Sequence, residues 1–125
     1  MFVGTSLLNI GTGLCATVSG TNLAKLLSGK AVAKSISGPD HALAVANLDQ
    51  LFPIAREYEH RPDRAGEPTV AAIRRFDAEM LSTDGRTLRV LMLVKETASP
   101  VQPNPLYTVE VRLEEVEPAS VPSNL

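Results

Sequence analysis

The sequence contains no tryptophan, a single cysteine and few aromatic residues, and each shortage excludes a class of structure or site. Aromatic residues make up 4% of the 125 residues, so the core has to be built mainly from aliphatic side chains. Because Cys15 is the only cysteine, no disulfide can form within the chain and no thiolate-rich metal site can be assembled. We therefore expect a domain that is stabilised by apolar burial rather than by cross-links.

The sequence also lacks a basic excess and a long apolar run. Its net charge is −2, whereas proteins that bind nucleic acid non-specifically usually carry a surplus of lysine and arginine. No run of about 18 apolar residues is present. No lysine or arginine precedes Lys25, although a secretory signal begins with positive charge. The sequence predicts no membrane span and no exported protein, and we expect a cytoplasmic location.

The N-terminal part of the chain predicts a hairpin followed by a short helix. Two apolar runs, 7–10 and 14–18, flank a Gly-Thr-Gly turn and indicate a β-hairpin. Thr21 is a suitable N-cap for a helix over residues 22–28, in which three leucines recur at helical spacing. Residues 30–38 have the composition of a polar connector.

A second helix is predicted over residues 40–52. Ser37 precedes a Gly-Pro pair, and proline is tolerated in the first turn of a helix. Asp40 adds a negative charge to that turn, which the helix dipole favours. Pro53 is expected to end or kink the helix. Residues 59–68 contain two prolines, a glycine and several charges, and they predict an exposed loop.

The strongest pattern in the sequence is a three-stranded antiparallel meander. Strands are predicted over 70–81, 87–96 and 107–113, and an Asp-Gly pair between the first two is typical of a hairpin turn. The second strand is apolar on both faces, which favours a central place in a sheet. Three prolines within 97–105 indicate a long loop between the second and third strands.

These elements together predict an α+β fold. We expect the N-terminal helices to pack on a three- to five-stranded antiparallel meander and to bury their apolar stripes on one of its faces. Residues 1–117 are predicted to form a single domain, and residues 118–125 a disordered tail.

A glycine-rich segment near the N-terminus matches a loose dinucleotide fingerprint, but its context does not. Residues 11–16 read Gly-Thr-Gly-Leu-Cys-Ala, and the segment that follows them is not typical of a helix. The next acidic residue is Asp40, farther away than the roughly 20 residues that the fingerprint requires.

Cys15 has no flanking base that could activate its thiol, so we expect it to be buried as a small apolar residue. No metal-ligand spacing is present, and we expect neither a cofactor nor a metal.

The densest charged cluster is His60-Arg61-Pro62-Asp63-Arg64. A histidine titrates near neutrality and an arginine can hold a phosphate through its planar fork, so the cluster could serve phosphoryl transfer. The simpler interpretation is a solvated loop in which Asp63 pairs with Arg61 or Arg64. Both interpretations stay open at this point.

A second group of charged residues lies on the predicted strands: Arg74, Arg75, Lys95, Glu96, Glu110 and Arg112. Because neighbouring residues of a strand point to opposite faces, only one of Arg74 and Arg75 is expected on the polar face. A cationic cleft with a glutamate would suit RNA cleavage by attack of the 2′-hydroxyl. Cross-strand ion pairs on a wet face are the commoner explanation.

Two further side chains have both a structural and a functional interpretation. His41 lies in the predicted first turn of a helix, a position that does not favour a cationic histidine, and we expect it at the surface or half-buried. Tyr107 alternates with the apolar residues of the third strand, so we expect it to pack in the core.

Short segments spread through the sequence carry a resemblance to a known family. In order they are Thr21-Asn22-Leu23-Ala24-Lys25, Leu27-Ser28-Gly29-Lys30, Val45-Ala46-Asn47-Leu48-Asp49, Leu51-Phe52, Pro62-Asp63-Arg64 with Gly66, Ile73-Arg74-Arg75-Phe76, Val94-Lys95-Glu96 and Leu106-Tyr107-Thr108-Val109-Glu110. The series resembles the large polyvalent protein-associated domains of bacteriophages, prophages and conjugative elements. These domains are often grouped near the phage nuclease-like domains of the barnase, EndoU, colicin and RelE type.

The resemblance implies helices packed on an antiparallel sheet and an origin in a mobile element of a bacterial host cell. The first hypothesis that follows is a non-enzymatic binding domain that acts on a host or phage protein. Its candidate binding residues are Arg61, Asp63, Arg64 and Arg74. The sequence does not specify the oligomeric state.

The alternative hypothesis is a metal-independent, ribonuclease-like effector or toxin domain, with RNA as its partner. The resemblance to the nuclease-like group implies cleavage on the concave face of the sheet. His60 would act as an acid or base and Glu110 as a second one, while Arg75 and Lys95 would hold the phosphate.

Overall fold

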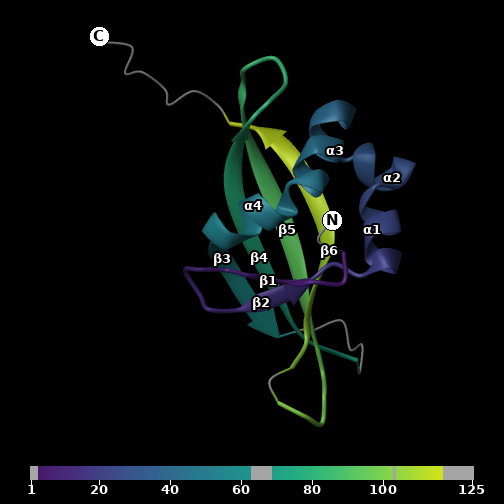
Figure 1. Cartoon of the computed structure of the whole chain (residues 1–125), viewed down its shortest axis with the longest axis vertical. Helices are drawn as coiled ribbons and strands as arrows, with labels where there is room; N and C mark the ends of the chain where they lie inside the picture. Colours follow the sequence, from purple (N-terminus) through teal and green to yellow (C-terminus); the bar gives the residue numbers. More distant parts are fainter. Residues whose placement is uncertain (1–2, 63–68, 103, 117–125) are drawn as a thin grey trace.

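The computed structural model describes residues 3–62, 69–102 and 104–116, which form one six-stranded sheet with four short helices. The order of the strands across the sheet is β1-β2-β6-β5-β4-β3 (Figure 1). Along the chain the elements are β1 (Ser6–Leu8), β2 (Cys15–Thr17), α1 (Gly20–Leu26), α2 (Gly29–Val32), α3 (Gly38–Ala46), α4 (Leu48–Ile54), β3 (Arg56–Pro62), β4 (Val70–Leu81), β5 (Thr87–Thr97) and β6 (Leu106–Glu115). None of the described helices is long and apolar enough to span a membrane.

The predicted fold class is wrong. The sheet is a curled half-barrel of six strands and dominates the structure, whereas we expected helices on a purely antiparallel meander of three to five strands. The sheet is mixed because β2 joins β6 in a parallel pairing, at Thr17 and Tyr107. The hairpin of β1 and β2 was predicted, but a local pattern cannot show which distant strand a hairpin will join.

The largest single error is β3, which lies where a loop was predicted. Residues 59–62 belong to this strand, and residues 63–68 lie outside the described residues, as does the predicted tail over 118–125. The prolines, the glycine and the charges of residues 59–68 suggested an exposed loop. In the structure β3 pairs antiparallel with β4, and partners on neighbouring strands neutralise several of these charges. Tertiary pairing therefore outweighs the local composition.

The long strands lie where the sequence predicted them. β4, β5 and β6 pair in order as antiparallel neighbours, and β5 has a partner on each side. The turn between β4 and β5 uses Gly85 with φ of 87°, a left-handed conformation that glycine adopts without steric cost. The backbone N–H of Ser82 donates to the carbonyl of Arg86 across the base of this turn, at 2.7 Å.

The helices differ in detail from the prediction. The side chain of Ser19, rather than Thr21, caps α1, and α2 forms inside the segment predicted as a connector. The predicted helix over 40–52 is two helices, α3 and α4, because Asn47 breaks the helical backbone between them. Ser37 accepts a hydrogen bond from the N–H of Asp40 and caps α3.

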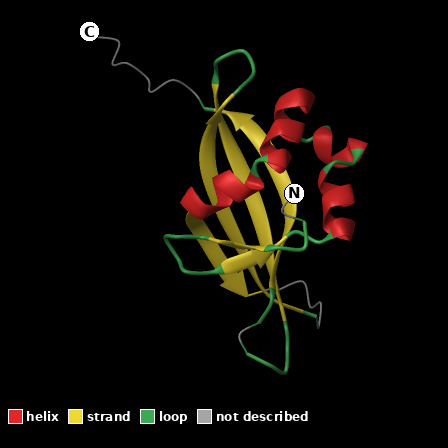
Figure 2. Ribbon diagram, viewed as in Figure 1, coloured by secondary structure: helices red, strands yellow, loops and turns green. Residues whose placement is uncertain are grey.

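The hydrophobic core lies between the helices and one face of the long strands, which we call the inner face (Figure 2). Phe76 of β4 and Met92 of β5 point into it and are almost fully buried. Phe52 of α4 meets Phe76 edge to face, with ring centroids 5.0 Å apart. The opposite side of β4, β5 and β6 is the outer face, which carries Arg75 and Leu93.

A β-bulge in β6 overturns the prediction for Tyr107. Leu93 pairs with Glu110 but Val94 pairs with Thr108, so Val109 is an extra residue that reverses the alternation. Thr108 is consequently on the inner face and 3% exposed. Tyr107 is on the outer face and half-buried rather than packed in the core.

Two single-residue predictions are also wrong. Cys15, expected to be buried, is exposed on the short strand β2. His41, expected at the surface or half-buried, is fully buried. Its ring binds groups from two other segments: Ser35 Oγ lies 2.6 Å from Nδ1, and the Leu26 carbonyl oxygen lies 2.7 Å from Nε2. A buried imidazole is stable when both of its nitrogens have partners.

Candidate functional site

Arg74 and Arg75 point to opposite faces of the sheet, as strand geometry predicted. Arg74 shares the inner face with Phe76, two residues further along β4, while Arg75 points to the outer face. Each arginine is the centre of a separate cluster of charged side chains. The structure therefore divides the predicted site residues between two surfaces.

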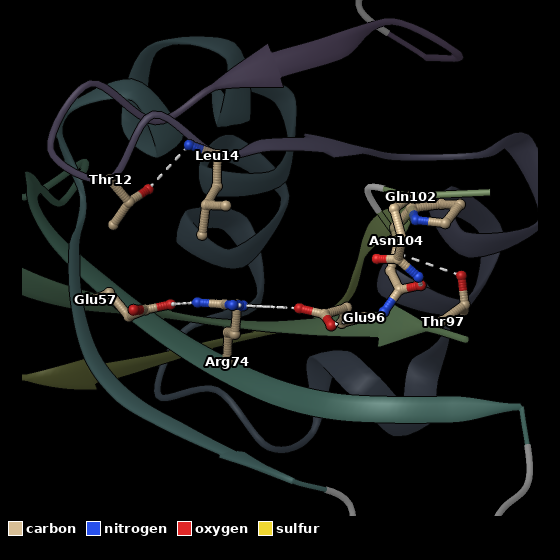
Figure 3. A network of polar contacts seen from close by, with 9 residues as sticks. Thr12, Leu14, Glu57, Arg74, Glu96, Thr97, Gln102 and Asn104 are labelled. Atoms are coloured by element: carbon tan, nitrogen blue, oxygen red, sulfur yellow. Dashed lines mark hydrogen bonds and ion pairs between the residues drawn. The ribbon is translucent and has the colours of Figure 1, made fainter. Parts of the chain in front are cut away.

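The inner cluster is a guanidinium held between two carboxylates (Figure 3). Nη1 of Arg74 lies 3.0 Å from Oε2 of Glu57 on β3, and its Nη2 lies 3.2 Å from Oε1 of Glu96 on β5. The three side chains are only 15–20% exposed. Because both carboxylates hold Arg74, this cluster ties β3, β4 and β5 together at one end of the inner face.

The loop between β5 and β6 completes the inner cluster. The side-chain amide of Asn104 donates to Oε2 of Glu96 at 2.9 Å. This hydrogen bond and the contacts with Arg74 lower the pKa of Glu96 below its usual range, and the nearby His60 adds to the effect. Glu96 therefore stays an anion at neutral pH and serves to anchor Arg74.

His60 is exposed and lies opposite Arg74 on β3, on the side of the inner cluster. Arg61 is also exposed, and its Nε lies 3.1 Å from Oε1 of Glu59. Asp63 and Arg64 fall outside the described residues. His60 and Arg61 thus lie on the edge strand of the sheet.

The outer face has an apolar centre with charged flanks. Leu93 of β5 lies between Arg75 of β4 and Glu110 of β6. In the next row Leu91 lies between Asp77 and Arg112. Leu91 is only 8% exposed although no described helix covers this side of the strands.

A cavity of about 180 Å³ opens on this face. Its lining combines apolar, aromatic and charged residues from four strands: Tyr58, Arg75, Leu91, Met92, Leu93, Glu110 and Arg112. Arg75 and Glu110, two of the residues named as catalytic candidates, therefore line the same cavity. Lys95 lies further along the outer face, opposite Tyr107, and is half-buried.

Ion pairs fix one side of the outer face. Asp77 binds both Arg56, with Nη2 at 3.2 Å, and Arg89, with Nη2 at 2.6 Å. Arg89 also contacts Glu114 at 2.8 Å and lies 5.1 Å from the centre of the Tyr58 ring. The hydrogen bond from Arg89 to Asp77 raises the pKa of the guanidinium above its ordinary value. This network holds Tyr58 at the rim of the cavity.

Arg75 and Arg112 are held much less firmly than Arg89. Nη1 of Arg75 lies 3.1 Å from Oε1 of Glu59, but the orientation does not make a hydrogen bond, so this buried nitrogen has no hydrogen-bond partner among the described residues. Arg112 is exposed, and its one ion pair with a described residue is a 4.0 Å contact with Glu114. Both guanidinium groups can therefore accept an anionic group that enters the cavity.

Tyr58 was missed as a site residue, because the sequence placed it at the boundary of a predicted loop rather than on a strand. Within the described residues no cluster of three or more histidine, cysteine, aspartate or glutamate side chains could hold a metal ion. The outer face offers apolar contact at Leu93, aromatic contact at Tyr58, and the guanidinium groups of Arg75 and Arg112, which can pair with an anion.

Comparison with known proteins adds one finding. The family model of the large polyvalent protein-associated domain 3 matches residues 1–107, which include all the helices and five of the strands in full. A search of curated proteins and a search of solved structures found no match.

Proposed function

We propose that this chain, which belongs to the large polyvalent protein-associated domain 3 family, is a non-enzymatic domain that binds a protein partner through its outer face. The observation that carries the proposal is the cavity between Tyr58, Leu93, Arg75 and Arg112 on a sheet face that no described helix covers. An apolar centre with tyrosine and arginine at its rim is the composition of protein-binding hot spots.

The loosely held arginines indicate the chemistry of the partner. A partner that places an acidic side chain in the cavity would pair with the guanidinium of Arg75, whose side chain is 29% exposed. An apolar side chain next to the acidic one would cover Leu93, which is half-buried in the free chain. We expect the partner to be a host or phage protein of the bacterial cytoplasm, in agreement with the mobile-element origin that the resemblance implies.

The ribonuclease hypothesis has weaker support. Arg75 and Glu110 line one cavity, but the register places His60 beside Arg74, at the other face of the sheet. General acid–base catalysis requires both groups within hydrogen-bond reach of one substrate. Incubation of the pure protein with a mixed RNA pool in EDTA tests this hypothesis, and RNA that stays intact at high protein concentration would exclude it.

Affinity capture with matched leucine variants tests the binding proposal. Leu93→Glu places a charge at the centre of the outer face, whereas Leu81→Glu makes the same change at a site that is 68% exposed and does not line the cavity. The tagged wild-type chain and Leu81→Glu should capture the same protein from a lysate of bacteria that carry the gene, and Leu93→Glu should lose it. Equal capture by all three chains would contradict the proposal.

A further inference from the structure

A second cavity lies on a different part of the molecule, between α1, α2 and β6. It has a volume of about 220 Å³, and three lysines line it: Lys25 of α1, Lys30 of α2 and Lys34 just after α2. Figure 1 shows the two helices side by side next to β6. This cavity is separate from the outer-face cavity, although Glu110 of β6 contributes to both.

The charges of the chain are strongly segregated around this second cavity. The first 39 residues contain these three lysines and no acidic residue, and all 14 acidic residues follow Pro39. Of the described residues in the lining, Glu110 alone is acidic. The Lys34 Nζ lies 3.8 Å from its Oε1, in a pair whose side chains are 50% and 38% exposed, so their attraction is weak.

Lys25 and Lys30 form no ion pair with any described residue. Three ammonium groups and one carboxylate leave the lining with two excess positive charges. All three lysines are exposed, so solvent screens their mutual repulsion, and a bound anion would lower it further. The cavity is therefore suited to a compact ligand that carries two negative charges.

We propose that the cavity between α1, α2 and β6 binds the terminal phosphate dianion of a phosphorylated ligand through Lys25, Lys30 and Lys34. Lysine is a flexible point charge that suits phosphate oxygens from several directions, whereas the planar fork of arginine suits carboxylates. Among the described residues the lining contains no arginine and no aromatic side chain on which a base could stack. The 14 acidic residues elsewhere repel an extended polyanion more than a compact one.

Titration of the ¹⁵N-labelled chain with three probes at constant ionic strength tests the proposal. The probes are inorganic phosphate, adenosine 5′-monophosphate and a ten-residue oligothymidylate without a terminal phosphate, whose internal phosphates carry one charge each. We expect saturable shifts of the backbone amides at Lys25, Ser28, Lys30 and Lys34 with the first two probes. Equal affinity for inorganic phosphate and adenosine 5′-monophosphate identifies the phosphate group alone as the ligand. Tighter binding of adenosine 5′-monophosphate identifies a nucleotide as the source of the phosphate group.

The variant Lys25→Gln/Lys30→Gln should weaken phosphate binding by about tenfold, since two cationic contacts are lost. Glutamine preserves helix propensity. The control Gln50→Glu/Ala98→Glu changes the net charge by the same amount at two exposed positions away from the cavity and should leave binding unchanged. Shifts that do not saturate, equal weakening by both double variants, or tighter binding of the oligothymidylate than of phosphate would each overturn the proposal.

Discussion

The Nε2 atom of His41 lies 2.7 Å from the carbonyl oxygen of Leu26, and this buried contact joins the first turn of α3 to the last residue of α1. Ser35 Oγ lies 2.6 Å from the other ring nitrogen and accepts a hydrogen bond from the N–H of Leu113 in β6. A neutral ring with its proton on Nε2 satisfies both contacts, with Ser35 donating to Nδ1. His41 thus organises the helices against β6, and a structural role explains its burial.

Substitution of His41 should destabilise the fold. His41→Phe fills the space but leaves the Leu26 carbonyl and Ser35 without their partner, so we expect a loss of about 1–3 kcal/mol in the free energy of unfolding. Urea denaturation measures this loss. Leu43→Ala, a change on the same helix at a side chain that is 40% exposed, is the control and should have a smaller effect. Equal losses for both variants would contradict the assigned role.

Removal of Arg74 should leave Glu57 and Glu96 as two facing carboxylates without their shared partner. For this partly exposed cluster we expect Arg74→Met to lower the free energy of unfolding by about 1–3 kcal/mol. The triple variant Arg74→Met/Glu57→Gln/Glu96→Gln should recover part of the loss, because no unpaired charge remains. Chemical denaturation of the wild type and both variants measures this. If the triple variant were less stable than Arg74→Met, repulsion between the carboxylates would not be the cause.

Asn104 should control the titration of Glu96. The pKa of Glu96 is lowered from 4.5, first of all by the hydrogen bond from Asn104. A lowered pKa in the folded state contributes stability above pH 4.5, and this contribution is lost as the pH falls through the folded-state pKa. Asn104→Ala should raise the pKa of Glu96, which carboxyl ¹³C shifts measure. Val101→Ala, in the same loop and 73% exposed, should not change it, and an unchanged pKa in Asn104→Ala would contradict the assignment.

The turn between β4 and β5 should produce an acid-sensitive component of stability. Hydrogen bonds from Ser82 and then Arg86 lower the pKa of Asp84 to about 2 from 3.8. The associated stability is present above pH 3.8 and is lost as the pH falls towards 2. Asp84→Asn should flatten the dependence of unfolding on pH in this window. Asp49→Asn, at an exposed position without an ion pair to a described residue, is the control, and the same flattening there would argue against a specific role for Asp84.

The parts of the fold that the sequence predicted depend on local patterns. Alternating apolar residues and an Asp-Gly turn were enough to place β4 and β5, because period-2 alternation and turn chemistry act within a few residues. β3 could not be predicted in this way. Its charges are compatible with a strand because Arg74 and Arg75 on β4 bind Glu57 and Glu59, and these contacts join residues far apart in sequence.

The candidate site likewise depends on features that local sequence patterns do not show. Strand periodicity correctly separated Arg74 from Arg75, but the extra residue Val109 reversed the alternation in β6 and moved Tyr107 to the outer face. A bulge leaves no reliable mark in a single sequence. The three lysines of the second cavity were likewise not recognised as a group, because they meet only when α1 and α2 pack beside β6.

Photocrosslinking in living cells tests the central claim, that the outer face binds a protein partner, most directly. A photoreactive p-benzoylphenylalanine replaces Leu93 in one chain and Gln50 of α4, an exposed residue on the other side of the sheet, in a second chain. After irradiation we predict a discrete adduct with one protein at position 93, its loss when Arg75→Glu is added, and none at position 50. The absence of an adduct at position 93, or identical adducts at both positions, would contradict the claim.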